Sequence, residues 1–390
     1  MNQIPRVELK SVNAQRASHR RRLKVVHVTC VHPLRDPRIF EKECRSLAED
    51  GHEVVLVAPH TRDEVLAGIR VRAIPPASSR KLRLVTSGWR AMAVALSERA
   101  DLYHLHDPEL LLPFQFARLF GKKLLFDMHE NLPKAVLAKE WISPSMRRLV
   151  AAIIRPLERL MLTGVPIVFA ENSYAADYPW ARRTSTILNY PTPEILDAAR
   201  CARRPGSVGY IGAVRPERGL TVTLQALREL KRAGRPLTFD LIGAIDPRNM
   251  AIITEYLSRD GLDVQLHGYL PLAKAWPLIS GCQIGLALLQ PMPNYVDSYP
   301  TKIFDYMGLG VPVLCSDFPL YRHLVEEVGC GRCVDPTRPD LIAEAIASML
   351  DNPEELESMG QRGIEAVRRR FNWTSQARHL KRFYEQVVST

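Results

Sequence analysis

Residues 297–317 read DSYPTKIFDYMGLGVPVLCSD, and they join two apolar stretches that are typical of buried strands. These strand-like stretches are residues 284–290 and 311–317. Between them the pattern predicts a short helix that runs from about Lys302. A strand, a helix and a second strand in this order form a parallel unit, because parallel strands need a crossover connection. This unit therefore favours an α/β fold.

The same alternation extends along the chain in both directions. Helical patterns, such as residues 39–50 and 219–234, separate further strand-like stretches. Apolar strands that alternate with helices indicate a parallel sheet covered on both faces. The predicted strands are residues 23–30, 53–59, 69–75, 102–106, 123–129, 166–171, 185–190, 208–214, 238–244, 264–270, 284–290 and 311–317.

We expect two doubly wound, Rossmann-like domains that face each other across a cleft. A segment that contains three prolines, Pro191, Pro193 and Pro205, separates the two halves and is the expected hinge. The expected boundaries are a basic flexible tail at 1–22, a first domain at 23–190, a linker at 191–206, a second domain at 207–372 and a final helix at 373–388 that packs back on the first domain.

Composition indicates a globular protein. Of the 390 residues, 46% are hydrophobic, and no apolar run approaches the ~20 residues that span a bilayer. The N-terminus lacks the apolar region of a signal peptide, so we expect a cytoplasmic enzyme. The seven cysteines are an odd number, which argues against a disulfide framework. The CGRC motif at 330–333 lacks further metal ligands at suitable spacing, and no metal site is expected there.

The net charge of +11 is concentrated at the N-terminus, where residues 1–24 carry seven basic residues against Glu8. This tail could be a solubilising leader, or it could be attracted to an anionic membrane surface. Nucleic-acid binding is disfavoured, because no nucleic-acid motif accompanies the charge. Residues 141–162 alternate apolar side chains and arginines, which fits an amphipathic helix in a membrane interface. A domain helix with solvated arginines fits the pattern equally.

Several motifs of nucleotide chemistry are absent from the sequence. It contains neither GxGxxG nor GxxxxGK, so the dinucleotide fingerprint and the P-loop are both missing. No two aspartates are separated by one residue, so the metal-binding pair of one class of sugar transferases is missing as well. Phosphate recognition would have to come from helix N-termini and basic side chains.

The stretch DSYPTKIFD at 297–305 combines such features. Thr301 is the predicted helix cap, and Lys302 adds a positive charge beside the free amides of the helix start, which suits a diphosphate. Asp305 could accept two hydrogen bonds from a ribose diol, and Asp297 could bind sugar hydroxyls. Alternatively, Asp297 is a loop residue and Asp305 a solvated carboxylate near the helix dipole.

A second group lies in YIGAVRPERG, where a predicted strand runs into a turn with Arg215 and Arg218. Two arginines at the end of a strand suit phosphate binding, although the stretch could also be a plain surface turn.

The first domain offers candidates on the acceptor side. HDPEL at 106–110 and FDMHE at 126–130 both end predicted strands, so His106 and His129 should reach the cleft edge and could position a sugar. Either histidine could instead be structural. The acceptor-side candidates are Arg35, Arg38, His106 and Asp107. The two arginines could meet an anionic acceptor, or they could pair with Asp36 or nearby glutamates.

Taken together, these segments resemble the retaining nucleotide-sugar glycosyltransferases of family 4, of the type that builds bacterial polysaccharides and glycoconjugates. The resemblance covers residues 23 to 388 and rests on two acids separated by seven positions, on the segment PTKIFDYMGLGVPVLCSD, on VDP at 334–336 and on FNW at 371–373. It implies the GT-B fold and a metal-independent transfer from a nucleotide-diphosphate sugar. A uridine-diphosphate sugar is the preferred donor and a guanosine-diphosphate sugar the alternative.

The resemblance implies roles for individual residues. The second acid, Asp305, would bind the ribose, and the first acid, Asp297, would contact the transferred sugar. Arg218 matches the basic residue before the glycine of the phosphate turn, and His129 matches the histidine that ends a strand of the first domain. The resemblance thus implies that His129, Arg218 and Asp297 are the catalytic residues. Both acids are Asp where Glu is usual in the family, and Ala213 stands where an arginine is expected.

The expected activity is sugar transfer to a hydroxyl of a glycan, a lipid-linked acceptor or a small molecule, with no cofactor. The expected location is the cytoplasm, with peripheral attachment to the inner face of the cell membrane as an option. A GT-B nucleotide-sugar epimerase and a non-catalytic nucleotide-sugar-binding subunit are the alternatives.

Overall fold

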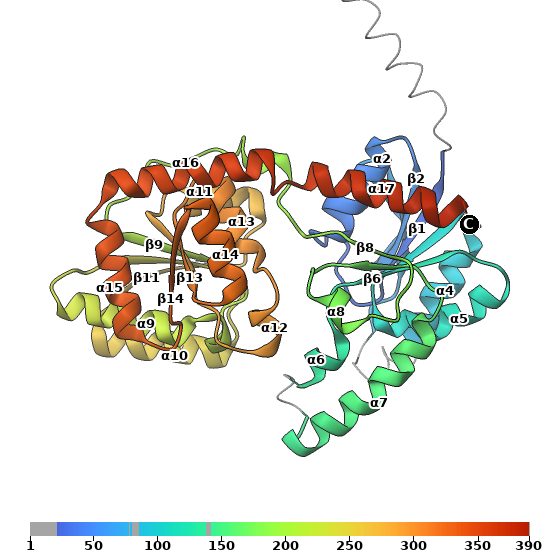
Figure 1. Cartoon of the computed structure of the whole chain (residues 1–390), viewed down its shortest axis with the longest axis horizontal. Coiled ribbons are helices and arrows are strands. Elements are labelled where there is room, and N and C mark those ends of the chain that lie inside the picture. The colour runs from blue at the N-terminus through green and yellow to red at the C-terminus, as the bar shows by residue number, and fades with distance from the viewer. Residues whose placement is uncertain (1–21, 78, 80–85, 138–141, 390) are drawn as a thin grey trace, which may run out of the picture.

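The structure is a computed structural model that describes residues 22–77, 79, 86–137 and 142–389. Nearly all of the basic tail expected at 1–22 lies outside these residues. Figure 1 shows two sheet-containing domains side by side, with the first half of the chain in one and most of the second half in the other. Both sheets are parallel except at one edge strand, β3, which pairs antiparallel with β4.

The first domain is built on an eight-stranded sheet of order β3-β4-β2-β1-β5-β6-β7-β8. The strands are β1 (Lys24–Val28), β2 (Glu53–Pro59), β3 (Glu64–Leu66), β4 (Ile69–Ile74), β5 (Leu102–Leu105), β6 (Leu124–Met128), β7 (Ile167–Phe169) and β8 (Thr184–Thr186). The short edge strand β3 was not predicted, and every predicted strand of this half appears with ends that differ by at most a few residues. Successive residues of β1 and β2 alternate between two buried clusters, one on each face of the sheet.

Two sets of helices cover the two faces of this sheet. One face packs against α4, α5 and α7, and the other packs against η1, α2 and the last helix of the chain. The helical elements of this half are η1 (Ile39–Cys44), α2 (Arg45–Glu49), α4 (Gly88–Ser97), η3 (Pro108–Leu110), α5 (Leu111–Leu119), α6 (Leu132–Leu137), α7 (Pro144–Leu162) and α8 (Tyr174–Asp177). The single helix expected at 39–50 begins as a π-helical turn, η1, before it continues as α2.

The second domain holds a six-stranded sheet of order β11-β10-β9-β12-β13-β14. Its strands are β9 (Ser207–Ile211), β10 (Thr238–Ile242), β11 (Asp263–Gly268), β12 (Ile284–Ala287), β13 (Val313–Ser316) and β14 (Gly331–Val334). The unit predicted from residues 297–317 is present as β12, α13 and β13, and the two strands pair in parallel. The edge strand β14 was not predicted.

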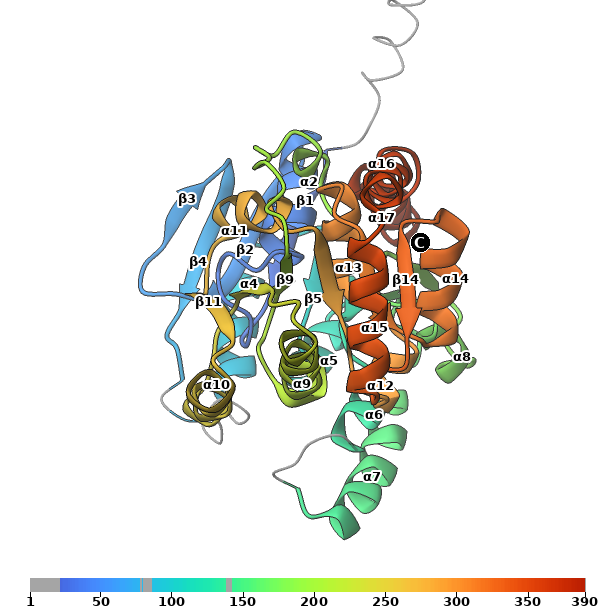
Figure 2. The same cartoon turned by 90° about the vertical axis from the view of Figure 1, so that its left-hand side faces the viewer.

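Helices also cover both faces of the second sheet, and Figure 2 shows α9 and α15 in front of it. The helical elements of this half are η4 (Pro193–Ile195), η5 (Pro216–Arg218), α9 (Leu220–Arg232), α10 (Pro247–Asp260), α11 (Leu272–Ser280), α12 (Pro293–Val296), α13 (Thr301–Gly308), α14 (Pro319–Val328), α15 (Pro339–Leu350), α16 (Pro353–Arg369) and α17 (Trp373–Ser389). None of the described helices combines the length and the apolar character that crossing a bilayer requires.

The chain returns to the first domain at its C-terminal end. In Figure 1, α16 runs along the second domain and α17 continues over the first. Leu380, Phe383 and Tyr384 of α17 are buried in the same cluster as β1 and β2 side chains. The amide of Trp373 donates to the carbonyl of Pro191, which ties the start of α17 to the segment expected as the hinge.

Candidate functional site

The strand order of each sheet reverses at one position, and the loops beyond the strand ends diverge there. In the first sheet the reversal lies between β1 and β5, and in the second it lies between β9 and β12. Ligands of doubly wound folds bind in the crevice that such diverging loops leave. The loops that follow these four strands carry most of the residues singled out in the sequence.

The helix α13 begins one residue earlier than predicted. Pro300, and not Thr301, is its N-cap, with an extended backbone of φ −72° and ψ 118°. Proline holds φ near this value, so the helix starts directly after it and Thr301 becomes the first helical residue. Thr301 is exposed, and no side chain in the described part of the chain caps the helix start. The first amides of a helix have no partner within the helix, so this end can meet an anion.

Lys302 is a buried lysine whose charged neighbours are Arg218 and Asp305. Its side chain is 5% exposed, and among the described residues its Nζ has no hydrogen-bond partner. The Nζ lies 3.7 Å from the centre of the Tyr210 ring, which gives a cation–π contact. Burial, together with the nearby charge of Arg218, holds the pKa of Lys302 well below its usual range.

Arg218 lies in the short helical turn η5, between β9 and α9. Its guanidinium lies over the ring of Tyr295 at 5.7 Å. The next residue, Gly219, has a φ of +95°, and a Cβ at this position would lie 2.4 Å from the carbonyl oxygen of Leu288. Only glycine fits this close approach of the turn to the end of β12. The turn therefore brings Arg218 beside Lys302, with two positive charges at one place.

Arg215 lies differently from its neighbour Arg218. Its side chain is 59% exposed, and its Nη1 is 3.6 Å from Glu217 Oε1. Ala213, where the family pattern expects an arginine, contributes its carbonyl as the acceptor for the Tyr210 hydroxyl at 2.7 Å. Lys302 is the cation that lies on Tyr210, next to Ala213.

Asp305 lies one turn into α13 and faces the first domain. Burial raises the pKa of Asp305 to about 6, although the charges of Lys42 and Lys302 oppose the shift. Lys42 belongs to η1, and its Nζ donates to the side-chain oxygen of Asn189 at 2.5 Å. The carboxylate thus has one cation from each domain beside it.

Asp297 follows α12 and is 55% exposed. Its Oδ2 lies 3.7 Å from the Nζ of Lys134 in α6, and the same ammonium is 2.7 Å from Asp177 Oδ2. Close by, the amide of Tyr299 donates to Glu171 Oε2 at 3.3 Å. The segment 297–305 therefore contacts the first domain at the junction, where the two domains face each other.

Beside Asp177 the first domain has a hollow of about 240 Å³ between α6, α7 and α8. Its lining is mainly apolar, with Trp180 and Tyr178 as aromatic walls and Lys134 and Arg155 as basic groups. The side chain of Glu158 at its wall accepts a hydrogen bond from the Tyr178 hydroxyl at 2.8 Å, and burial raises the pKa of Glu158 to about 7.

The two arginines expected on the acceptor side both pair with carboxylates. Arg35 is exposed, and its Nη1 donates to Glu41 at 3.2 Å. Arg38 is only 4% exposed, and its Nε and Nη2 donate to the two oxygens of Asp127 at 2.9 Å each. Its partner Asp127 is itself fully buried. Arg38 therefore forms an ion pair inside the domain and is not available to an acceptor.

His129 and His106 differ in their access to the surface. The side chain of His129 is 17% exposed, and its Nε2 lies 2.9 Å from Asp127 Oδ2 and 3.2 Å from His106 Nδ1. His106 does not reach the cleft edge, because η1 and α17 cover this face of the sheet. It is 1% exposed, and burial lowers its pKa to about 4.

Asp107 organises the loop after β1. Its Oδ2 accepts hydrogen bonds from the Thr29 hydroxyl at 2.8 Å and from the Cys30 amide at 2.6 Å. Its Oδ1 lies 2.8 Å from Nδ1 of His32, and this hydrogen bond helps to raise the pKa of His32 against the opposing effect of burial.

Sequence reasoning missed three buried polar residues beside His106, namely His27, Glu43 and His104. A signal for them was present. His104 and His106 are two positions apart in the predicted strand 102–106, so that strand would place them on one face of the sheet, and His27 lies in the neighbouring central strand. Three histidines on one face of a buried sheet are unusual, because such a face is normally apolar.

Two protein-family models match the chain. The family described as "Glycosyl transferase 4-like domain" matches residues 38–183, and "Glycosyl transferases group 1" matches residues 199–366. Together they cover most of the two sheet domains.

Characterised relatives are distant. A mannosyltransferase of Mycolicibacterium hassiacum is 22% identical over 321 residues, which are 78% of this chain and 75% of that protein. An α-D-kanosaminyltransferase of Streptomyces kanamyceticus is 24% identical over 191 residues, 46% of this chain and 45% of that protein. The match thus spans less than half the length of the latter relative.

Solved structures share the fold over nearly the whole chain. A sucrose-phosphate synthase from Thermosynechococcus elongatus aligns with a TM-score of 0.76 at 17% identity, over 95% of this chain and 100% of that one. The Anabaena protein HepE, solved with UDP and glucose, aligns with a TM-score of 0.69 at 13% identity, over 93% and 99%. With both domains matched, the chain belongs to the family 4 glycosyltransferases and has their GT-B fold.

Proposed function

We propose that this glycosyltransferase moves a sugar from a nucleotide-diphosphate donor to a hydroxyl group, with retention of anomeric configuration. The observation that carries the proposal is the pair of neighbouring cations at the start of α13. Lys302 Nζ is buried without a hydrogen-bond partner among the described residues, and Arg218 is close enough to lower its pKa. A buried cation without a partner is costly, and a second cation beside it adds repulsion. A diphosphate would relieve both.

The donor is inferred to lie along residues 297–305. Its diphosphate would accept hydrogen bonds from Lys302, Arg218 and the first amides of α13, and its ribose hydroxyls would donate to Asp305. Asp297 and His129 would contact the transferred sugar. A uridine diphosphate donor is preferred, because the similar protein HepE was solved with UDP and with UDP-glucose.

Catalysis would rest on charge that is already in place. As the bond between sugar and phosphate breaks, negative charge grows on the leaving diphosphate. Fixed positive groups then stabilise the transition state more than the ground state. The acceptor would attack from the face that the diphosphate leaves, with a phosphate oxygen taking its proton. Lys302, Arg218 and the helix amides supply the positive charge in this scheme, so the donor needs no divalent metal.

The acceptor is proposed to lie in the hollow between α6, α7 and α8. Lys134 links this hollow to the donor side, since its ammonium lies near both Asp177 and Asp297. Trp180 and Tyr178 offer aromatic walls for a sugar ring or an isoprenoid chain, and Arg155 offers charge for a phosphate. A lipid-linked acceptor fits this combination of apolar and basic lining.

A lipid-linked acceptor would be reached at a membrane, and we propose that the protein attaches peripherally to an anionic membrane. The helix α7 exposes an apolar face at positions three or four residues apart, and it projects from the rest of the molecule in both overall views. The exposed apolar residues are Met146, Leu149, Ile153, Leu157 and Leu160. Arg148, Arg155 and Arg159 of the same helix are also exposed. Helices with an exposed apolar face and flanking arginines bind to the interface between a membrane and water.

Replacing Asp305 with Asn should weaken binding of a nucleoside diphosphate roughly tenfold or more, because hydrogen bonds to a charged group contribute about 1.5–3 kcal/mol. Calorimetry with UDP measures this at pH 7.5. The pKa of Asp305 is raised to about 6, so the carboxylate is present above this pH and is lost as the pH falls below it. The wild type should therefore approach the affinity of the variant near pH 5. Equal affinities at pH 7.5 would exclude the ribose role.

Replacing Arg218 with Ala should lower kcat for transfer by roughly 10²–10³-fold, as loss of one charge-stabilising group does. Arg232→Ala, in the exposed last turn of α9, is the matched control and should keep wild-type turnover. The measurement is release of nucleoside diphosphate in the presence of acceptor. A kcat unchanged by Arg218→Ala would rule out its role at the diphosphate.

The double change Ile153→Asp and Leu157→Asp should abolish co-sedimentation with vesicles that contain anionic phospholipid, because charge on the apolar face opposes insertion. Tyr269→Asp, a change at an exposed aromatic residue of the second domain, is the control and should bind as the wild type does. Co-sedimentation that survives the double change would contradict α7 as the membrane-binding surface.

A further inference from the structure

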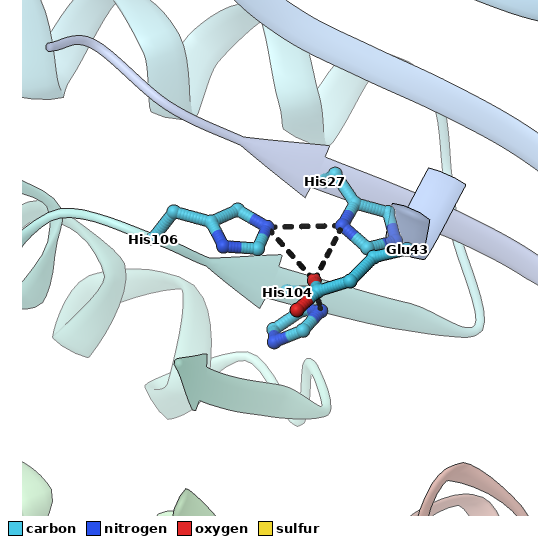
Figure 3. Close-up of side chains that lie close together, drawn as sticks. All are labelled: His27, Glu43, His104 and His106. Atoms are coloured by element: carbon cyan, nitrogen blue, oxygen red, sulfur yellow. Dashed lines mark hydrogen bonds and ion pairs between the residues drawn. The ribbon is translucent and has the colours of Figure 1, made fainter. Parts of the chain in front are cut away.

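Three imidazoles and one carboxylate meet inside the first domain, away from the proposed donor site. They belong to His27, His104, His106 and Glu43, which are at most 1% exposed (Figure 3). The histidines come from β1, from β5 and from the residue after β5, and Glu43 comes from η1. None of these four residues takes part in the proposed transfer.

The fold itself brings the four groups together. His27 and His104 are register partners in adjacent parallel strands, and His106 lies on the same face two residues further on. The π-helical turn η1 packs on this face and carries Glu43. π-helical turns occur frequently at functional sites. The groups are thus held by the central strands of the sheet and not by mobile loops.

One atom from each residue can be chosen so that all four lie within 4.8 Å of one another. Glu43 Oε2 is 3.8 Å from His27 Nδ1, 3.7 Å from His104 Nδ1 and 3.9 Å from His106 Nε2. His27 Nδ1 and His106 Nε2 are 2.9 Å apart. Figure 3 shows the carboxylate oxygen pointing toward the three rings.

The four groups do not satisfy one another by hydrogen bonding alone. Among the residues that the structure describes, neither oxygen of Glu43 has a hydrogen-bond partner, although Oε1 is 3.1 Å from the Arg38 guanidinium in an ion pair. The distances from Oε2 to the three ring nitrogens are too long for hydrogen bonds. A buried carboxyl oxygen without a partner is costly, so a further group between these four atoms would stabilise the domain.

The spacing of the ligand atoms suits a metal ion. Four of the six distances between them lie between 2.9 and 3.9 Å, and all are within 4.8 Å. In a regular tetrahedron the centre lies at about 0.6 of the edge length from each corner, so edges of 2.9–3.9 Å put the centre about 1.8–2.4 Å from the ligand atoms, which matches zinc–nitrogen and zinc–oxygen bonds.

The surroundings also suit a cation. A histidine that binds a metal commonly has its other ring nitrogen held by a carboxylate or another polar group. His106 Nδ1 is 3.4 Å from Asp127 Oδ2, and His27 Nε2 is 3.4 Å from the Tyr384 hydroxyl.

The cation beside Glu43 does not compete for its carboxyl group. The positive charge of Arg38 is matched by Asp127, to which it makes two hydrogen bonds. Glu43 Oε2 is therefore left facing the three imidazoles. His104 Nδ1 now faces the Tyr384 hydroxyl at 2.5 Å and would turn to the ion, leaving Tyr384 to His27.

We propose that His27, His104, His106 and Glu43 bind one structural Zn²⁺ ion that joins the sheet of the first domain to η1. The ion would not touch the donor, so this site is independent of the proposed transfer chemistry. Its role is to fix η1, and with it Lys42, against the sheet.

The test is the metal content of untagged, full-length protein after growth with added zinc, measured by elemental mass spectrometry. About one zinc ion per chain is expected for the wild type. The variants Glu43→Gln and His27→Gln should carry close to none. His267→Gln is the matched control, because His267 pairs with the buried Asp240 in the second domain, and this variant should keep its zinc.

A second measurement covers variants that fail to fold. Wild-type protein refolded with Co²⁺ should show the visible absorption of a four-coordinate cobalt ion, and removal of the metal should lower its unfolding temperature. Wild-type protein without zinc as purified, and without this absorption after refolding with Co²⁺, would overturn the proposal. Zinc retained by Glu43→Gln and His27→Gln would overturn it as well.

Discussion

The buried ion pair between Arg38 and Asp127 fixes the side of the first domain that faces its partner domain. Arg38 donates to both oxygens of Asp127, and its remaining terminal nitrogen donates to the carbonyl of Ile187 at 2.8 Å. One guanidinium thus joins η1, β6 and the chain after β8. Removing one partner of such a pair costs about 3–5 kcal/mol, because the other charge is left buried and unpaired. His129 also lies 2.9 Å from Asp127, and Lys42 lies in η1, the helical segment that begins directly after Arg38.

In the second domain, by contrast, a buried basic side chain has no hydrogen-bond partner among the described residues. Arg38 and Asp127 are fully paired, whereas Lys302 is buried without a hydrogen-bond partner among the described residues and has Arg218 nearby. Natural proteins depart from full pairing of buried charges mainly where a ligand completes the set. The contrast explains why the donor is proposed at Lys302 and Arg218, and why Arg38 is left out of the acceptor site.

Much of the fold could be predicted, because alternating apolar strands and helices leave few arrangements other than two parallel sheets. The motifs also predicted that Lys302 lies near the start of a helix between two parallel strands, with Asp305 one turn further along that helix. The burial of the His106 side chain could not be predicted in the same way. Its burial depends on η1, whose π-helical turn has no clear sequence signal, and on Tyr384 of α17, which contacts His104 across 280 positions of sequence. Such long-range packing is not encoded in local periodicity.

The proposed transfer requires that residues 297–305, with Arg218, hold a nucleoside diphosphate. A crystal structure of the protein with UDP bound would test this requirement. The diphosphate oxygens should lie within hydrogen-bond distance of Lys302 Nζ and of the Arg218 guanidinium, with the ribose hydroxyls on Asp305. A nucleotide bound elsewhere, with Lys302 still unpaired, would contradict it.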